Sequence, residues 1–110
     1  MILHITAENF HKAVEQTPKP VVLDIYADWC GPCQQMAPIF EELANDFQDT
    51  YIFAKLNVDE SRELAIKLGV SSLPTFLFLK KGVVVGKVTG YLDKHSLKHK
   101  IEEQFNRKKD

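Results

Sequence analysis

Residues 21–27 form an almost continuous apolar run, and this run most constrains what the chain can fold into. A strand with one solvated face alternates apolar and polar residues, but here Asp24 alone carries a charge. Strands of this kind are covered on both faces, as in parallel sheets flanked by helices. Residues 51–58 give a second buried strand. We therefore expect an α/β architecture built around a buried sheet.

Three further strands are predicted at residues 2–5, 75–79 and 83–88. The last two are separated by a Lys-Lys-Gly turn, which is typical of a tight hairpin. We expect parallel pairing among the first three strands, through right-handed crossovers, and antiparallel pairing in the hairpin. The order β-α-β-α-β-α-β-β-α fits one domain covering residues 1–110.

Four helices are expected between and after these strands. Thr6 is a suitable N-cap for the first helix, and Asp93 for the last. The second helix follows residue 30 and contains Pro38, which should kink it. The third helix covers residues 59–68; Asp59 or Ser61 caps it and Gly69 ends it.

Composition excludes several classes of protein. The chain has 14 Lys and Arg against 15 Asp and Glu, a net charge of −1, which argues against a nucleic-acid binder. Every uncharged stretch is shorter than the about 20 apolar residues that a membrane-spanning helix needs. Residues 1–8 lack the basic start of a secretory signal. We therefore expect a soluble, cytoplasmic protein without membrane or nucleic-acid partners.

The chain has two cysteines, too few for a small domain held together by disulfides. Cys30 and Cys33 lie where the second strand leads into a helix, and this spacing brings two thiols together across one helical turn. The unpaired N–H groups of a helix start stabilise a thiolate at Cys30. Pro32 suits the first turn, and Gly31 leaves the backbone beside the sulfur open.

A disulfide across four residues is a poor staple, since loop entropy gives it only about 2 kcal/mol. We therefore interpret the pair as a redox switch. Two other interpretations stay open: two inert buried cysteines, or half of a zinc site completed by His95 and His99. The zinc site fits poorly, because zinc fingers separate the two ligand pairs by about 12 residues and here residues 34–94 intervene.

Several motifs along nearly the whole chain match one known family. These motifs are Phe10, the Asp-bearing strand, the Trp29-Cys30-Gly31-Pro32-Cys33 string, Pro38, residues 54–59, Leu73-Pro74-Thr75, Lys81-Gly82 and Gly90. Together they resemble the thioredoxin family. A C-x-x-C pair alone would be weak evidence, but the five-residue string together with the distant Pro74-Thr75 is specific.

The resemblance implies a thioredoxin fold, with a central five-stranded mixed β-sheet flanked by four α-helices. It also implies a protein-disulfide reductase in which Cys30 attacks, Cys33 resolves, and Gly31 and Pro32 tune the redox chemistry. No cofactor would be bound. Electrons would come from NADPH through thioredoxin reductase, and the partners would be that reductase and oxidised client proteins. We expect the chain to act as a monomer in cell redox homeostasis.

The resemblance assigns further residues to the site. Burial should raise the pKa of Asp24, and the family makes this residue the acceptor of the Cys33 proton, with Lys55 as its partner. A strand-edge Asp24 with a path to solvent and a surface Lys55 are the alternatives. The groove would hold Trp29, Val58, Leu73, a cis Pro74, Thr89 and Gly90; apart from Trp29, these could equally be core or turn residues.

The sequence is also compatible with two competing functions. A thioredoxin-fold oxidant or isomerase usually has a histidine between its cysteines, whereas Gly31-Pro32 resembles the reducing members. A binding module whose thiols are idle is the second alternative. Gln34 stands where many family members have Lys or Arg, which removes a positive charge near the thiols.

Overall fold

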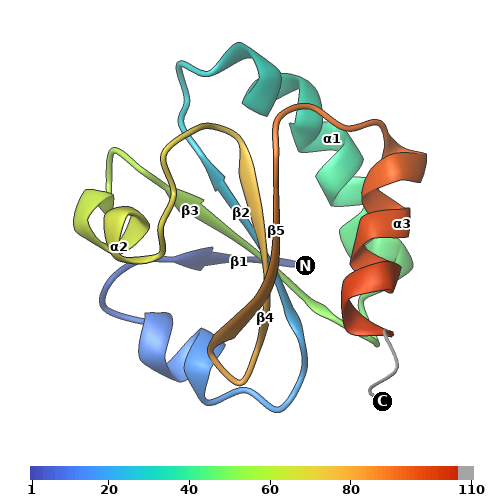
Figure 1. Cartoon of the computed structure of the whole chain (residues 1–110), viewed down its shortest axis with the longest axis horizontal. Coiled ribbons are helices and arrows are strands. Elements are labelled where there is room, and N and C mark those ends of the chain that lie inside the picture. The colour runs from blue at the N-terminus through green and yellow to red at the C-terminus, as the bar shows by residue number, and fades with distance from the viewer. Residues whose placement is uncertain (107–110) are drawn as a thin grey trace.

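The computed structural model describes residues 1–106. Its elements follow the predicted order (Figure 1): β1 (Ile2–Ile5), η1 (His11–Glu15), β2 (Val21–Tyr26), α1 (Gly31–Asp46), β3 (Ile52–Asn57), α2 (Arg62–Lys67), β4 (Thr75–Lys80), β5 (Val83–Thr89) and α3 (Lys94–Phe105). Four helices therefore accompany five strands, and the expected fold class is confirmed.

The strands form one mixed sheet in the order β1-β3-β2-β4-β5. β3 pairs in parallel with β1 and β2, whereas β4 is antiparallel to both β2 and β5. β2 is therefore the central strand, and Asp24 lies opposite Lys55 on β3 and Phe76 on β4. This position explains the long apolar run, because β2 has strands on both sides and helices over both faces.

Two hydrophobic clusters cover the two faces of the sheet. The first packs α1 and α3 on one face, and its members are Val22, Met36, Phe40, Leu43, Ala44, Tyr51, Phe53, Phe76, Phe78, Leu97, Ile101 and Phe105. The second packs η1 and α2 on the other face (Figure 1). Alternate β2 residues supply the two clusters, as the period of a strand requires.

The predicted helix ends are partly confirmed. The carboxylate of Asp93 accepts the Ser96 N–H at 2.8 Å and caps α3, and Gly69 ends α2 with a φ of +80°. Asp59 does not cap α2, since Ser61 holds the N-cap position without a side-chain hydrogen bond. Pro38 lies inside α1 as expected.

The first helix is shorter than the sequence predicts. The hydroxyl of Thr6 does accept the Glu8 N–H, and the Thr6 carbonyl accepts the Phe10 N–H at 3.1 Å, but residues 7–9 form hydrogen-bonded turns rather than a regular helix. The side chain of Asn9 accepts the Thr6 N–H and donates to the His4 carbonyl, and so ties the segment to the end of β1. The helix that follows, η1, is a single π-type turn closed by a hydrogen bond from Gln16 N–H to the His11 carbonyl.

The hairpin between β4 and β5 is confirmed. Lys81 and Gly82 both have positive φ, +50° and +81°, as a two-residue hairpin turn of the primed type requires. A Cβ on Gly82 would also lie 3.1 Å from the Cα of Glu15, so η1 leaves no room for a side chain there. Within residues 1–106, no helix combines the length and apolarity needed to cross a membrane.

Phe40 provides a test of the core. It is fully buried, with its ring centroid 5.3 Å from that of Phe53 and 5.9 Å from that of Phe76. We expect Phe40→Ala to lower the free energy of unfolding of the oxidised protein by about 3–5 kcal/mol, because it leaves a cavity between α1 and the sheet. Urea denaturation measures this change.

Val83→Thr is the matched control, since Val83 is 64% exposed on β5 and Thr keeps the branched Cβ. It should change the free energy of unfolding by less than about 0.5 kcal/mol. A loss below about 1 kcal/mol for Phe40→Ala would contradict this description of the core.

Candidate active site

The two cysteines lie at the N-terminal end of α1. Cys30 is the N-cap residue, with an extended backbone, and a disulfide joins it to Cys33 in the first turn. The Cys33 N–H donates to Sγ of Cys30 at 3.2 Å. Pro32 occupies the first turn, where its missing N–H costs nothing. The start of the helix thus directs a backbone donor at the sulfur of Cys30.

Cys30 and Cys33 line different cavities of the site. Cys30 lines a pocket of about 620 Å³, together with Trp29, Gly31 and Pro32. Cys33 instead lines a smaller cavity of about 230 Å³ that also contains Lys55 and Gln34. Both cysteines are buried as residues. A second protein can therefore approach Cys30 through the pocket, while Cys33 faces away from it.

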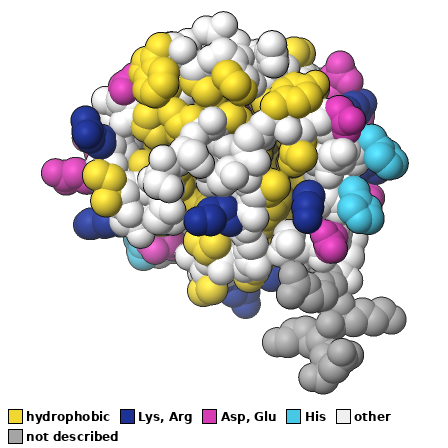
Figure 2. Space-filling view, turned by 45° about the horizontal axis from the view of Figure 1, so that its top comes forward, with side chains coloured by type: hydrophobic (Ala, Val, Ile, Leu, Met, Phe, Trp, Pro, Cys, Tyr) yellow, Lys and Arg dark blue, Asp and Glu magenta, His cyan; other side chains and the backbone are white. Residues whose placement is uncertain are grey.

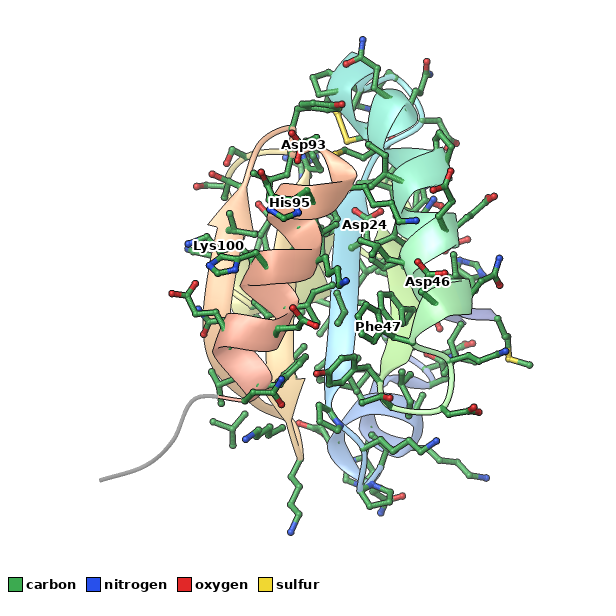
Figure 3. All side chains as sticks on the ribbon, turned by 90° about the vertical axis from the view of Figure 1, so that its right-hand side faces the viewer. Asp24, Asp46, Phe47, Asp93, His95 and Lys100 are labelled. Atoms are coloured by element: carbon green, nitrogen blue, oxygen red, sulfur yellow. A yellow bond between two sulfur atoms is a disulfide. The ribbon has the colours of Figure 1, made fainter. Side chains whose placement is uncertain are left out.

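Asp24 lies beneath the disulfide end of α1, on the face of β2 between α1 and α3 (Figure 3). Its side chain is 2% exposed, and among residues 1–106 its Oδ1 has no hydrogen-bond partner. Burial raises the pKa of Asp24 from its ordinary value of 3.8 to about 7, and the positive charge of Lys55 opposes part of that rise. The expected burial of this carboxylate is confirmed, and a strand-edge position is excluded.

Lys55 is half-buried beside this carboxylate. It is the register partner of Asp24 on β3, and its Nζ lies 4.5 Å from the centroid of the Tyr26 ring. A lysine ammonium at this distance is attracted to the negative face of an aromatic ring. Tyr26, which follows Asp24 on the same face of β2, therefore fixes the charge of Lys55 near the carboxylate.

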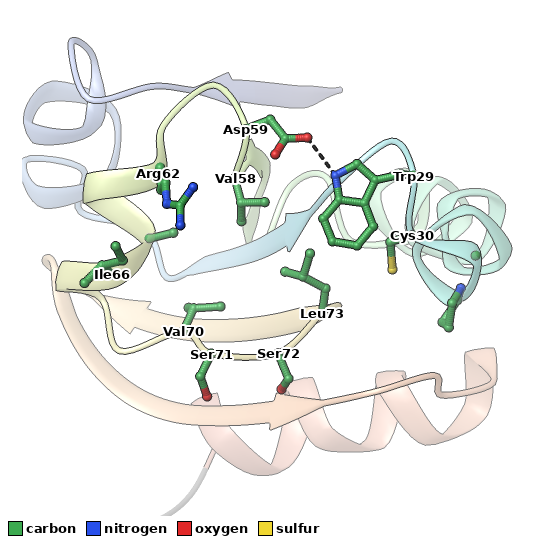
Figure 4. A pocket seen from close by; sticks show the side chains of 13 residues that line it. Trp29, Cys30, Val58, Asp59, Arg62, Ile66, Val70, Ser71, Ser72 and Leu73 are labelled. Atoms are coloured by element: carbon green, nitrogen blue, oxygen red, sulfur yellow. Dashed lines mark hydrogen bonds between the residues drawn. The ribbon is translucent and has the colours of Figure 1, made fainter.

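The pocket beside Cys30 contains three of the predicted groove residues, Trp29, Val58 and Leu73 (Figure 4). Trp29 is 70% exposed, and its Nε1–H donates to the carboxylate of Asp59 at 2.8 Å. This bond holds the indole at the rim of the pocket. Hydrophobic side chains gather on the upper part of the face in Figure 2, with charged side chains around them.

The other predicted groove residues lie outside the lining of this pocket. The Leu73–Pro74 peptide bond is cis, as expected, and Pro74 is buried. Its carbonyl accepts the Gly90 N–H at 2.9 Å, and Thr89 pairs with Thr75 across β4 and β5. Thr89 and Gly90 are thus joined to the Pro74 segment.

The pocket also has a side that the sequence did not predict, formed by α2 and the loops on either side of it. Arg62 and Ile66 line it from α2, Asp59 from the loop before it, and Val70 and Ser71 from the loop after it. A signal was present for α2, because positions 62 and 66 are four residues apart and so lie on one face of a helix. Asp59 was predicted only as a helix cap, whereas in the structure its carboxylate accepts a hydrogen bond from Trp29.

The structure separates the residues of the zinc alternative. His95 and His99 are exposed on α3 (Figure 3 labels His95), and neither lines the pockets at Cys30 and Cys33. Within the described part of the chain, no three His, Cys, Asp or Glu side chains are grouped so that they could hold a metal ion.

Comparison with known proteins places this geometry in a family. The thioredoxin family model matches residues 1–103. The thioredoxin of Chlorobaculum thiosulfatiphilum is 42% identical over 100 residues, which are 91% of this chain and 93% of that protein. The thioredoxin of Haemophilus influenzae is 38% identical over 104 residues, covering 94% and 97% of the two chains. The chain therefore belongs to the thioredoxin family of thiol–disulfide oxidoreductases.

Proposed function

We propose that this chain is a general protein-disulfide reductase that cycles between a dithiol and a Cys30–Cys33 disulfide. It would act as a single-domain, cytoplasmic monomer in cell redox homeostasis, recharged by NADPH through thioredoxin reductase. Members of this family typically act on oxidised client proteins and need no bound cofactor. The observation that carries the proposal is a disulfide at a helix start with Cys30 on an open pocket and Cys33 turned from it.

Cys30 is the nucleophile in the first step. In the reduced protein its thiolate is stabilised by the Cys33 N–H and by the positive end of α1. The thiolate attacks one sulfur of a client disulfide, so that a mixed disulfide forms and the client bond breaks. The client's other sulfur leaves as a thiolate and takes a proton from solvent.

Cys33 resolves the mixed disulfide in the second step. Its thiolate attacks Sγ of Cys30, the Cys30–client bond breaks, and the client leaves with its second thiol while Cys30–Cys33 is oxidised. Asp24 takes the Cys33 proton, through a water. A carboxyl whose pKa is about 7 suits this role, because near neutral pH it both accepts and returns a proton readily.

The remaining predicted residues support these two steps. Lys55 keeps the pKa of Asp24 from rising further, since its charge favours the ionised carboxylate. Trp29, Val58 and Leu73 provide apolar contacts for the client, and the Pro74 segment with Thr89 and Gly90 borders them. Gly31 and Pro32 give the turn between the cysteines its shape and leave space above the sulfur.

Substitution of the cysteines tests their roles separately. Cys30→Ser is expected to abolish reduction of insulin disulfides with dithiothreitol as electron donor, because the attacking sulfur is lost. In a reaction without dithiothreitol, Cys33→Ser should still attack and should accumulate a mixed disulfide with the client, detected by mass spectrometry as an adduct that dithiothreitol added afterwards removes. Val83→Thr, remote from the pocket, should keep full activity, and continued turnover by Cys30→Ser would refute the mechanism.

The electron source has its own test. An NADPH-dependent thioredoxin reductase should reduce the oxidised protein, with one NADPH consumed per Cys30–Cys33 disulfide because both are two-electron couples. NADPH absorbance follows the reaction, and the Cys30→Ser, Cys33→Ser double variant should give none. If several such reductases fail and the pair is more oxidising than the cytosolic glutathione pool, the protein is an oxidant or isomerase instead.

The pKa of Asp24 gives stability a definite dependence on pH. The folded protein keeps the Asp24 proton up to about pH 7, because the pKa of this group is raised to about 7, whereas the unfolded chain releases it near pH 3.8. Raising the pH through this window therefore favours the unfolded state. Asp24→Asn cannot ionise, so the oxidised variant should be more stable than the wild type by on the order of 2–4 kcal/mol at about pH 8, with no gain at about pH 4.

Urea denaturation at several pH values measures this difference. Asp93→Asn is the control, since hydrogen bonds from Ser96 lower the pKa of that exposed carboxyl, and this variant should gain no stability as the pH rises. An Asp24→Asn variant whose advantage is the same at every pH would contradict the raised pKa.

A further inference from the structure

We propose that Arg62 and Ile66 form a second contact site in the Cys30 pocket, selecting client segments with an acidic side chain near the reducible cysteine. This inference rests on the proposed reductase function and specifies its substrates. Both residues are on α2, and both line the pocket that contains Cys30.

The pocket is large enough for several client residues at once. Its volume of about 620 Å³ lies within the range of about 300–1,000 Å³ that is usual for binding sites. Figure 4 shows Trp29 and Cys30 at one end, Arg62 and Ile66 at the other, and Val58 and Leu73 between them. A client segment whose sulfur reaches Cys30 would therefore extend toward α2.

The pocket lining has two charged side chains, Asp59 and Arg62, which differ in their hydrogen bonding. The Asp59 carboxylate already accepts the Trp29 indole N–H. Arg62 is the only Lys or Arg in the lining, and no residue among 1–106 forms a hydrogen bond or ion pair with its guanidinium. The pocket therefore has a carboxylate that is hydrogen-bonded to Trp29 and, at the α2 end, a guanidinium without a partner among residues 1–106.

This charge fits a carboxylate best. A guanidinium pairs with a carboxylate through two parallel hydrogen bonds, which adds geometric selectivity to the attraction. Ile66 follows Arg62 by one helical turn and is 64% exposed, so an apolar surface lies beside the cation. We therefore expect clients with Asp or Glu at the Arg62 end and an apolar neighbour that contacts Ile66.

The test uses reduced full-length protein and synthetic peptides, each with one cysteine joined by a disulfide to a chromogenic aryl thiol. Cys30 attacks the peptide sulfur and releases the coloured thiolate, and Cys33 then attacks Cys30 and releases the peptide. Glu, Gln or Lys is placed at each position within about five residues of the cysteine, since an extended chain advances about 3.3 Å per residue. Stopped-flow absorbance gives each second-order rate constant.

At the best position, the Glu peptide should react about three- to tenfold faster than the Gln peptide, and the Lys peptide should be slowest. The Glu advantage should shrink at about 1 M salt, which screens exposed charges. Arg62→Glu should invert the order of the Glu and Lys peptides. Because each variant is compared with itself, a general loss of reactivity does not affect these ratios.

Lys67→Glu is the matched control, with the same charge change on the same helix at an exposed residue outside the pocket lining. This variant should keep the wild-type ratio between the rate constants of the Glu and Gln peptides. Equal rate constants for the Glu and Gln peptides at every position would overturn the inference. A Lys67→Glu variant that changes the peptide preference as much as Arg62→Glu does would also overturn it, because the preference would then come from net charge.

Two other outcomes are also decisive. If the wild type reduces none of the peptides, the reductase function fails and this inference fails with it. If the Glu and Gln peptides have equal second-order rate constants, and both constants fall as the protein concentration rises, a second copy of the chain covers the pocket. In that case only this inference is overturned.

Discussion

The hydrogen bond from the Cys33 N–H to Sγ of Cys30 is the contact on which the site depends. It requires Cys30 to be the N-cap of α1, and this in turn requires β2 to deliver the chain to the start of that helix. The two hydrophobic clusters hold β2 and α1 in these positions. The fold thus keeps one sulfur at the positive end of a helix, on the side of the molecule where the pocket opens.

The burial of Asp24 lowers the stability of the folded protein. A carboxylate in the central strand, with one oxygen unpartnered among the described residues, destabilises the folded protein once it ionises. An apolar residue would suit the sheet better. On the proposed mechanism this cost is offset by function, because the same burial brings the pKa of Asp24 to about 7, where a proton can be exchanged with Cys33 near neutral pH.

Local patterns in the sequence were enough to predict most of the fold. Apolar runs predicted β2 and β3, and the Lys81-Gly82 turn predicted the hairpin, because strand burial and turn conformation depend on nearby residues. The hydrogen bond from the Asn9 side chain to the His4 carbonyl at the end of β1 could not be predicted, because no sequence pattern indicates it. The bond between Trp29 and Asp59 joins residues thirty positions apart, and no local pattern carries it. The same holds for the Lys55 ammonium over the Tyr26 ring.

The most direct test of the account measures the reactivity of each thiol in the reduced protein. Iodoacetamide alkylation at about pH 7, followed by peptide mass spectrometry, gives separate rates for Cys30 and Cys33, with the same protein unfolded in urea as reference. We predict that folded Cys30 reacts at least about tenfold faster than unfolded Cys30, because a free thiol is only about 3% thiolate at that pH, and that Cys33 reacts more slowly. Equal rates for folded and unfolded Cys30, or faster alkylation of Cys33, would contradict the account.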